Sequence, residues 1–240
     1  MIKPNEDRTP LRSDRRLISA ALIGLILVAA IAVIAARAGN GSSGAASPGT
    51  ATAGPIASSS CGLSDGPQSV TSAAPRTNWK LNGKMAAPSS KTFGPAHVDR
   101  GVHSCFARNP VGAIFAAANF YTDALGQGKV NQVFVDRWFL EGPAKRQAQR
   151  ALDANSPADD KEPIPQQIVG YRIDNYSKTR TTVTLVTQET AGPTAGGLRA
   201  TPTTVVWDRR DWRIDLDNSG VSTPTRIPSL TGFIKWSGVS

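Results

Sequence analysis

The sequence predicts an α+β protein in which an N-terminal transmembrane helix precedes a domain of about three helices packed on a four-stranded antiparallel sheet. Three observations lead to this fold class. Residues 17–36 form an uncharged apolar segment, residues 110–154 space apolar side chains as helices do, and residues 169–216 alternate apolar and polar side chains. Apolar periods of about 3.6 and 2 residues are typical of amphipathic helices and half-buried strands. Helices that precede an antiparallel sheet are typical of the α+β class.

The apolar segment 17–36 has the length of a transmembrane helix. It contains twenty residues without a charge, and its only polar side chain is Ser19. As a helix it would measure roughly 30 Å, the thickness of the hydrocarbon core of a bilayer. Three arginines precede it: Arg12, Arg15 and Arg16. By the positive-inside rule, residues 1–16 form a cytoplasmic tail, and the chain beyond the segment lies outside the cytoplasm as part of a single-pass cell-membrane protein.

A cleaved signal peptide is the alternative interpretation of this segment. Residues 36–38 read Ala-Arg-Ala, which resembles a small-residue cleavage site. However, the apolar part of a signal peptide is usually about 7–15 residues long, and an arginine suits the centre of such a site poorly. We therefore favour a retained anchor. Ala20 and Gly24 are spaced for helix association, which leaves homo-oligomerisation open.

Residues 37–78 are expected to form a disordered linker, and residues 79–240 an extracytoplasmic domain. Between residues 38 and 60, all but two positions are Ala, Gly, Ser, Thr or Pro. Such a composition cannot bury enough apolar surface to fold. Both cysteines, Cys61 and Cys105, lie on the predicted outer side. A pair of cysteines in an oxidising compartment predicts a disulfide.

Three helices are predicted in the first half of the domain. Asn109 is a suitable N-cap, Pro110 suits the first helical position, and Gly126 ends this helix. Apolar spacing predicts a second helix over residues 130–140 and a third over residues 144–154. The Gly-, Pro- and Ser-rich chain before Pro110 is expected to be irregular.

Four antiparallel strands are predicted after the acidic loop at residues 158–162. Apolar and polar side chains alternate over residues 169–173, 183–185, 198–207 and 212–216. A tight turn at residues 208–211 joins the last two strands. The remaining C-terminal tail contains apolar residues that are expected to fold back onto the domain.

The order of these elements and several motifs indicate a resemblance to a known family. The matching residues are Trp79, Pro88, Gly94-Pro95, Cys105-Phe106-Ala107, Pro110, Gly112-Ala113, Ala116-Ala117-Ala118-Asn119 and Trp236-Ser237-Gly238. With them, the chain resembles actinobacterial anchored proteins that accompany integrative conjugative elements and plasmids. The outer domain resembles the cone-shaped nuclear-transport-factor-2-like fold of the bitopic assembly component of type IV secretion systems. The resemblance implies a curved sheet and an envelope scaffold in DNA transfer, and it supplies no catalytic motif.

The same anchor-plus-cone plan resembles mycobacterial membrane proteins associated with lipid import, so the plan alone leaves the pathway open. The alternative function is therefore a small-ligand or lipid-binding module that uses the pocket of the cone. A large apolar cavity between helices and sheet would favour that alternative, and a filled core would favour a scaffold.

Candidate metal and catalytic residues are few. His97, His103 and Cys105 have the spacing H-x5-H-x-C, which could supply three zinc ligands. No fourth ligand is evident, and Cys105 has a partner in Cys61, so we expect neither a metal nor a cofactor. The sequence also lacks nucleophile-elbow, Walker, H-E-x-x-H and C-x-x-C motifs.

Two helical carboxylates, Asp123 and Asp136, are the candidates for acid–base chemistry. Both histidines precede the helices, so a catalytic pair would need Tyr121 or Tyr171. We expect both aspartates instead to lie on polar helix faces at the surface. The sequence therefore predicts a protein that is not an enzyme.

The formal net charge is +9, of which the first sixteen residues contribute +2 through five basic and three acidic side chains. A basic helix face is predicted from Arg137, Lys145, Arg146 and Arg150. Because this face has no interleaved aromatic residues and lies outside the cytoplasm, we expect it to contact an acidic protein or wall polymer rather than nucleic acid. The expected partners are other membrane or envelope proteins of a conjugative, type IV secretion-like apparatus.

Overall fold

The computed structural model describes residues 59, 61–126, 130–154, 165–218 and 220–238. The predicted anchor at residues 17–36 and the first part of the predicted linker lie outside these residues. Within the described ranges, no helix is both long and apolar enough to span a membrane.

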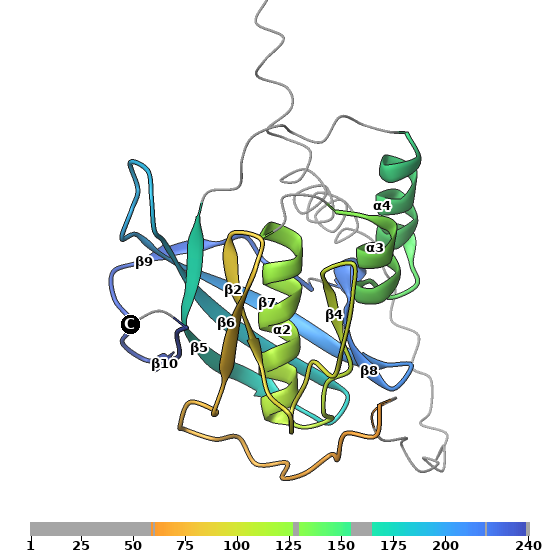
Figure 1. Ribbon diagram of the computed structural model, residues 1–240, viewed down its shortest axis with the longest axis horizontal. Coiled ribbons are helices and arrows are strands. Elements are labelled where there is room, and N and C mark those ends of the chain that lie inside the picture. Colours follow the sequence, from red (N-terminus) through yellow and green to blue (C-terminus); the bar gives the residue numbers. More distant parts are fainter. Residues whose placement is uncertain (1–58, 60, 127–129, 155–164, 219, 239–240) are drawn as a thin grey trace, which may run out of the picture.

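A six-stranded antiparallel sheet forms one side of the domain (Figure 1), with the strand order β10-β5-β6-β7-β8 and with β9 paired to β7. The strands are β5 (Gln166–Tyr176), β6 (Arg180–Glu189), β7 (Leu198–Asp208), β8 (Asp211–Ile214), β9 (Thr225–Ile227) and β10 (Ile234–Lys235). The prediction of a four-stranded sheet is therefore wrong, because the C-terminal tail adds β9 and β10. Strands of two or three residues are too short to show an alternating pattern.

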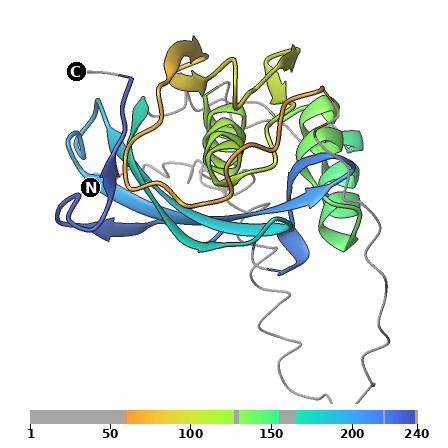
Figure 2. The same cartoon turned by 90° about the horizontal axis from the view of Figure 1, so that it is seen from below.

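Three α-helices occur in the described part of the chain: α2 (Pro110–Leu125), α3 (Gln132–Trp138) and α4 (Pro143–Asp153). As predicted, Asn109 caps α2, because its side chain accepts a hydrogen bond from the Gly112 backbone nitrogen at 2.7 Å. Only α2 crosses the face of the curved sheet, whereas α3 and α4 lie together at one end of the domain (Figure 2). The prediction of three helices packed on the sheet is corrected accordingly.

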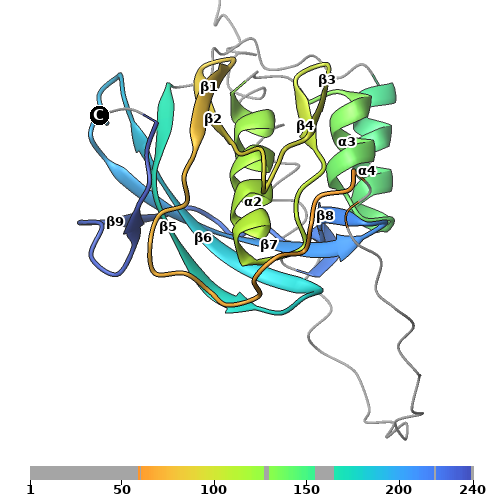
Figure 3. The ribbon, with the colours of Figure 1, turned by 60° about the horizontal axis from the view of Figure 1, so that its bottom comes forward.

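Two hairpins form a further layer on the side of α2 that faces away from the sheet (Figures 2 and 3). One consists of β1 (Asn78–Asn82) and β2 (Met85–Ser89), and the other of β3 (His97–Asp99) and β4 (Val102–Ser104). The expectation of an irregular segment is wrong here. The two-residue loop of the first hairpin is Gly83-Lys84, because Asn82 pairs with Met85. A glycine at the first position of such a loop is a hairpin signal, and Gly83 has a φ of 64°. The many glycines and prolines around it hide that signal.

The core lies on both sides of α2. On the sheet side, Tyr171, Val183, Leu185 and Val205 are fully buried. The alanines of α2 are also buried, and their small side chains allow the sheet and the hairpins to approach the helix closely. At Gly112 a Cβ atom would lie only 1.9 Å from the Ala107 carbonyl oxygen, so the chain requires glycine there.

Residues 61–78, which we expected to be the last part of a disordered linker, contact the domain. The Gln68 amide donates a hydrogen bond to the Arg108 carbonyl at 3.0 Å, and the Tyr171 hydroxyl donates to the Ala73 carbonyl at 3.2 Å. The structure contains the predicted disulfide between Cys61 and Cys105, whose Cα atoms are 5.9 Å apart. The disulfide joins the start of this segment to the residue that follows β4.

Candidate functional site

Asp123 is a buried carboxylate at the centre of the domain. It lies on α2 and its side chain is fully buried. Its Oδ1 atom accepts hydrogen bonds from Asn82 Nδ2 at 2.9 Å and from His103 Nδ1 at 2.6 Å. Its Oδ2 atom accepts from the His103 backbone nitrogen at 2.8 Å and from Trp138 Nε1 at 2.9 Å. These four bonds connect α2 to both hairpins and to α3.

The prediction that Asp123 lies at the surface is wrong, and so is the argument that a histidine could not reach it. The β3–β4 hairpin folds back over α2 and brings His103 to the carboxylate, although His103 precedes the helix in sequence. Asp136, in contrast, is exposed as predicted, with a side chain that is 53% accessible.

An Asp–His pair can orient a general base when the histidine also faces a nucleophile. Among the described residues, the His103 ring hydrogen-bonds to Asp123 and to no hydroxyl or thiol. Both Asp123 oxygens are already occupied by protein donors, which is the arrangement that a buried carboxylate needs for stability. The geometry therefore assigns this cluster a role in holding the layers together.

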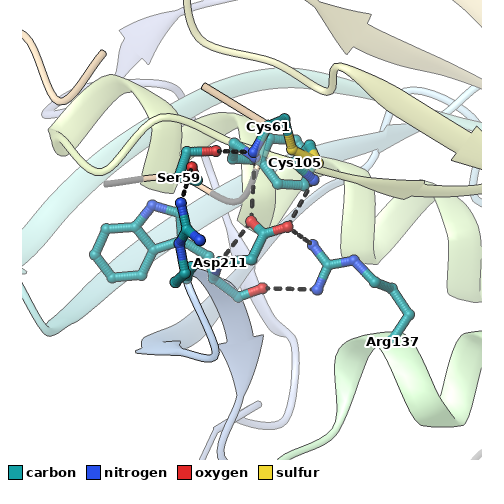
Figure 4. The surroundings of a disulfide bond; sticks show 8 residues. Ser59, Cys61, Cys105, Arg137 and Asp211 are labelled. Carbon is teal, nitrogen blue, oxygen red and sulfur yellow. Dashed lines mark hydrogen bonds and ion pairs between the residues drawn. A yellow bond between two sulfur atoms is a disulfide. The ribbon is translucent and has the colours of Figure 1, made fainter. Parts of the chain in front are cut away.

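Asp211 forms a second buried carboxylate cluster, beside the disulfide (Figure 4). Its Oδ2 atom accepts hydrogen bonds from the Cys105 backbone nitrogen and from Arg137 Nη2, both at 2.6 Å. Its Oδ1 atom accepts from the backbone nitrogens of Phe106 at 3.1 Å and of Trp212 at 2.9 Å. Asp211 thus fixes the disulfide-bearing chain, the start of β8 and α3 relative to one another.

Arg137 is the cation of this cluster, and its side chain is only 13% exposed. Burial lowers the pKa of its guanidinium, and the nearby Asp211 carboxylate opposes that shift. Arg137 also donates to the Trp212 carbonyl at 3.3 Å and lies over the Trp138 ring at 4.8 Å. These contacts leave Arg137 unable to act as part of an exposed binding face.

The predicted basic face is therefore divided. Lys145 is buried rather than exposed, and its Nζ atom lies 2.8 Å from Glu141 Oε1 and 3.4 Å from Asp136 Oδ1. The prediction that it projects outward with its neighbours is wrong. The aliphatic part of its side chain lies against the domain, and the Nζ atom at its end reaches the two carboxylates. Arg146 and Arg150 are exposed on α4. Only these two of the four residues remain accessible to a partner.

The hypothetical zinc ligands are not brought together. Cys105 is in the disulfide, His103 faces Asp123, and His97 is exposed on β3. The tyrosines proposed as partners of an acid are occupied elsewhere. Burial raises the pKa of Tyr171 to about 12, and it also raises the pKa of Tyr121, which lies near Thr187 and Thr201.

The fold and these two clusters define a disulfide-bonded, sheet-rich domain in which the buried carboxylates connect structural layers. The chain matches a family model described as a domain of unknown function (DUF8175) over residues 41–235, and it belongs to that family. No curated protein and no solved structure matches the chain.

Proposed function

We propose that this protein is a membrane-anchored scaffold of a conjugative, type IV secretion-like DNA-transfer apparatus. In this proposal, residues 17–36 cross the cell membrane and the described domain lies outside the cytoplasm. The observation that carries it is the disulfide between Cys61 and Cys105, because disulfides persist in oxidising compartments and are rare in the cytosol. The apolar segment supports the anchor. The resemblance to conjugative-element proteins supports the link to DNA transfer.

The interior of the domain favours a scaffold over a ligand-binding or catalytic module. Side chains on the sheet beneath α2, including Val183, Leu185 and Val205, are fully buried, as a filled core requires. The oxygens of Asp123 and Asp211 are bonded to protein donors. Such groups stabilise relative positions of elements and leave contact with partners to the outer surface.

The partner surface that we propose is the exposed side of α4 around Arg146 and Arg150. Neither arginine makes an ion pair among the described residues, so both charges are available to an acidic surface. Confinement to the membrane raises the local concentration of the domain near its partners, and weak electrostatic contacts can then suffice.

Gene deletion followed by complementation tests this function. Deletion should reduce DNA transfer from the host, and the full chain should restore it. Residues 38–240 behind a cleavable signal should complement poorly, because the domain then diffuses away from the membrane. Unchanged transfer after deletion would show that the protein has no role in this process.

A further inference from the structure

A polar hollow of about 550 Å³ lies beside the open end of the β1–β2 hairpin. The chain that enters β1 and the chain that leaves β2 line it, with Thr77, Trp79, Lys80, Ser89, Ser90 and Lys91 among the lining residues. Sites for small ligands have volumes of about 300–1,000 Å³, so the hollow could hold one or a few sugar-sized units. Neither carboxylate cluster contributes a residue to it.

The charge of the hollow is positive. Lys80 and Lys91 are exposed, and within the described ranges neither side chain makes an ion pair or a hydrogen bond. Among the described residues that line the hollow, none is acidic. Two cations without a counter-ion at a concave surface attract anionic groups.

Trp79 provides the hollow with a fixed aromatic side chain. Its ring centroid lies 4.9 Å from that of Trp236, which in turn contacts both Phe115 and Tyr171 at 5.4 Å. A Cβ atom at Gly238 would lie 2.5 Å from the Trp79 ring, so the C-terminal chain also holds the indole closely. Trp79 is half-buried and lines the hollow, so the part of the indole that stays exposed has a fixed position, and the C–H face of a sugar can pack against it.

Hydroxyl groups complete the hollow. Ser89 Oγ donates to the Asn78 carbonyl at 3.1 Å, and Ser90 Oγ accepts from the Thr92 backbone nitrogen at 3.3 Å. Because a hydroxyl can donate once and accept twice, each retains capacity for a ligand. Cations, an aromatic surface and hydroxyls together match a sugar that carries a negative group.

We propose that this hollow binds an anionic saccharide unit of a cell-surface polymer. That the polymer is a component of the cell surface rests on the proposed function, which places the domain outside the cytoplasm. The site itself rests on Lys80, Lys91 and Trp79. It is distinct from the α4 surface proposed to contact proteins.

Binding of defined oligosaccharides to the purified full chain in detergent tests the site. The probes are oligogalacturonate, which is an acidic sugar chain, maltodextrin, which is neutral, and polyphosphate, which is anionic without a sugar. The Lys80→Glu/Lys91→Glu variant reverses both charges of the hollow. The matched control, Lys178→Glu/Arg226→Glu, changes the net charge equally at two exposed positions that do not line the hollow.

We expect oligogalacturonate to bind more tightly than either other probe, and the hollow variant to bind it about tenfold more weakly, whereas the control loses no more than about twofold. Equal losses in both variants would mean diffuse attraction by net charge and would overturn the proposal. So would absence of binding, or equal binding of maltodextrin or polyphosphate. This assay uses purified protein, so it can fail while the DNA-transfer test succeeds, and the reverse.

Discussion

Two basic regions of the domain differ in whether their cations have partners. At the end formed by α3, α4 and β8, Arg137 pairs with Asp211 at 2.6 Å and Arg213 with Asp208 at 3.5 Å. In the hollow beside β1, Lys80 and Lys91 have no such partner among the described residues. The paired cations of the first region hold elements together, whereas the two lysines of the hollow, like Arg146 and Arg150 on the outer side of α4, stay available to a partner.

The difference follows from where the acidic residues lie. The turn at residues 208–211 reads Asp-Arg-Arg-Asp, so an acid stands at each end of it, and each acid meets a cation in the folded chain. Residues 66–98 contain four cations and no Asp or Glu. A cluster of basic residues therefore indicates an accessible surface only where acids are absent from the elements that pack around it.

The largest expected loss of stability follows from disrupting the paired region. Asp211→Asn should lower the free energy of unfolding by about 3–5 kcal/mol, because it leaves Arg137 buried without a counter-ion. Urea denaturation of the variant and the parent protein measures this change. Asp208→Asn is the control in the same turn, and it should cost no more than about 1 kcal/mol because Asp208 is 38% exposed. Similar losses in both variants would mean that burial of the pair does not matter.

The disulfide should have the next largest effect. It closes a loop with a sequence separation of 44 residues. In the chain-entropy model such a loop contributes about 3–4 kcal/mol, so Cys61→Ser/Cys105→Ser should lower stability by that amount. Urea denaturation measures the loss, and the addition of a reductant should destabilise only the parent protein. Two free thiols in protein prepared from the cell envelope under alkylating conditions would contradict the disulfide.

Lys145 and Arg146 allow a direct comparison of a buried and an exposed cation on one helix. Lys145→Glu should lower the free energy of unfolding by about 3 kcal/mol, since it places a second acid beside Glu141 in a buried position. Arg146→Glu should change stability by no more than about 0.5 kcal/mol. Thermal and urea unfolding measure both. Equal stability of the two variants would mean that Lys145 projects outward like Arg146, as the sequence predicts.

The sequence predicts the elements of this domain better than their contacts. The cap at Asn109 and the strands β5, β6, β7 and β8 follow from local patterns, which depend only on neighbouring residues. The position of His103 beside Asp123 does not, because it depends on how a hairpin folds over α2. Burial of Lys145 likewise depends on tertiary packing that helical periodicity does not specify.

The unpaired basic region could be predicted from the sequence. The acid-free stretch at residues 66–98 and the Gly83-Lys84 turn together indicate a hairpin with uncompensated cations. The position of the aromatic side chain beside these cations depends on the C-terminal chain, since Trp236 and Gly238, more than 150 residues away in sequence, hold the Trp79 ring. No local pattern predicts that contact.

The smallest expected effect concerns Tyr171, which contacts Trp236 and thereby the aromatic cluster behind the hollow. Burial raises its pKa to about 12 in the folded protein, whereas the pKa of a tyrosine in an unfolded chain is about 10. Above pH ~10 the unfolded chain therefore releases the phenolic proton before the folded chain does, and the free energy of unfolding should fall as the pH rises toward ~12. Below pH ~10 this contribution is fully present.

Tyr171→Phe should remove this part of the alkaline loss of stability. The variant should also be about 1 kcal/mol less stable at neutral pH, because it loses the hydrogen bond to the Ala73 carbonyl. Urea unfolding across the alkaline range measures stability, and phenolate absorbance measures titration. If the parent and the variant lost stability in parallel above pH ~10, the Tyr171 hydroxyl would be solvated rather than buried. The hydrogen bond to the Ala73 carbonyl would then not hold the chain before β1 against the sheet in solution.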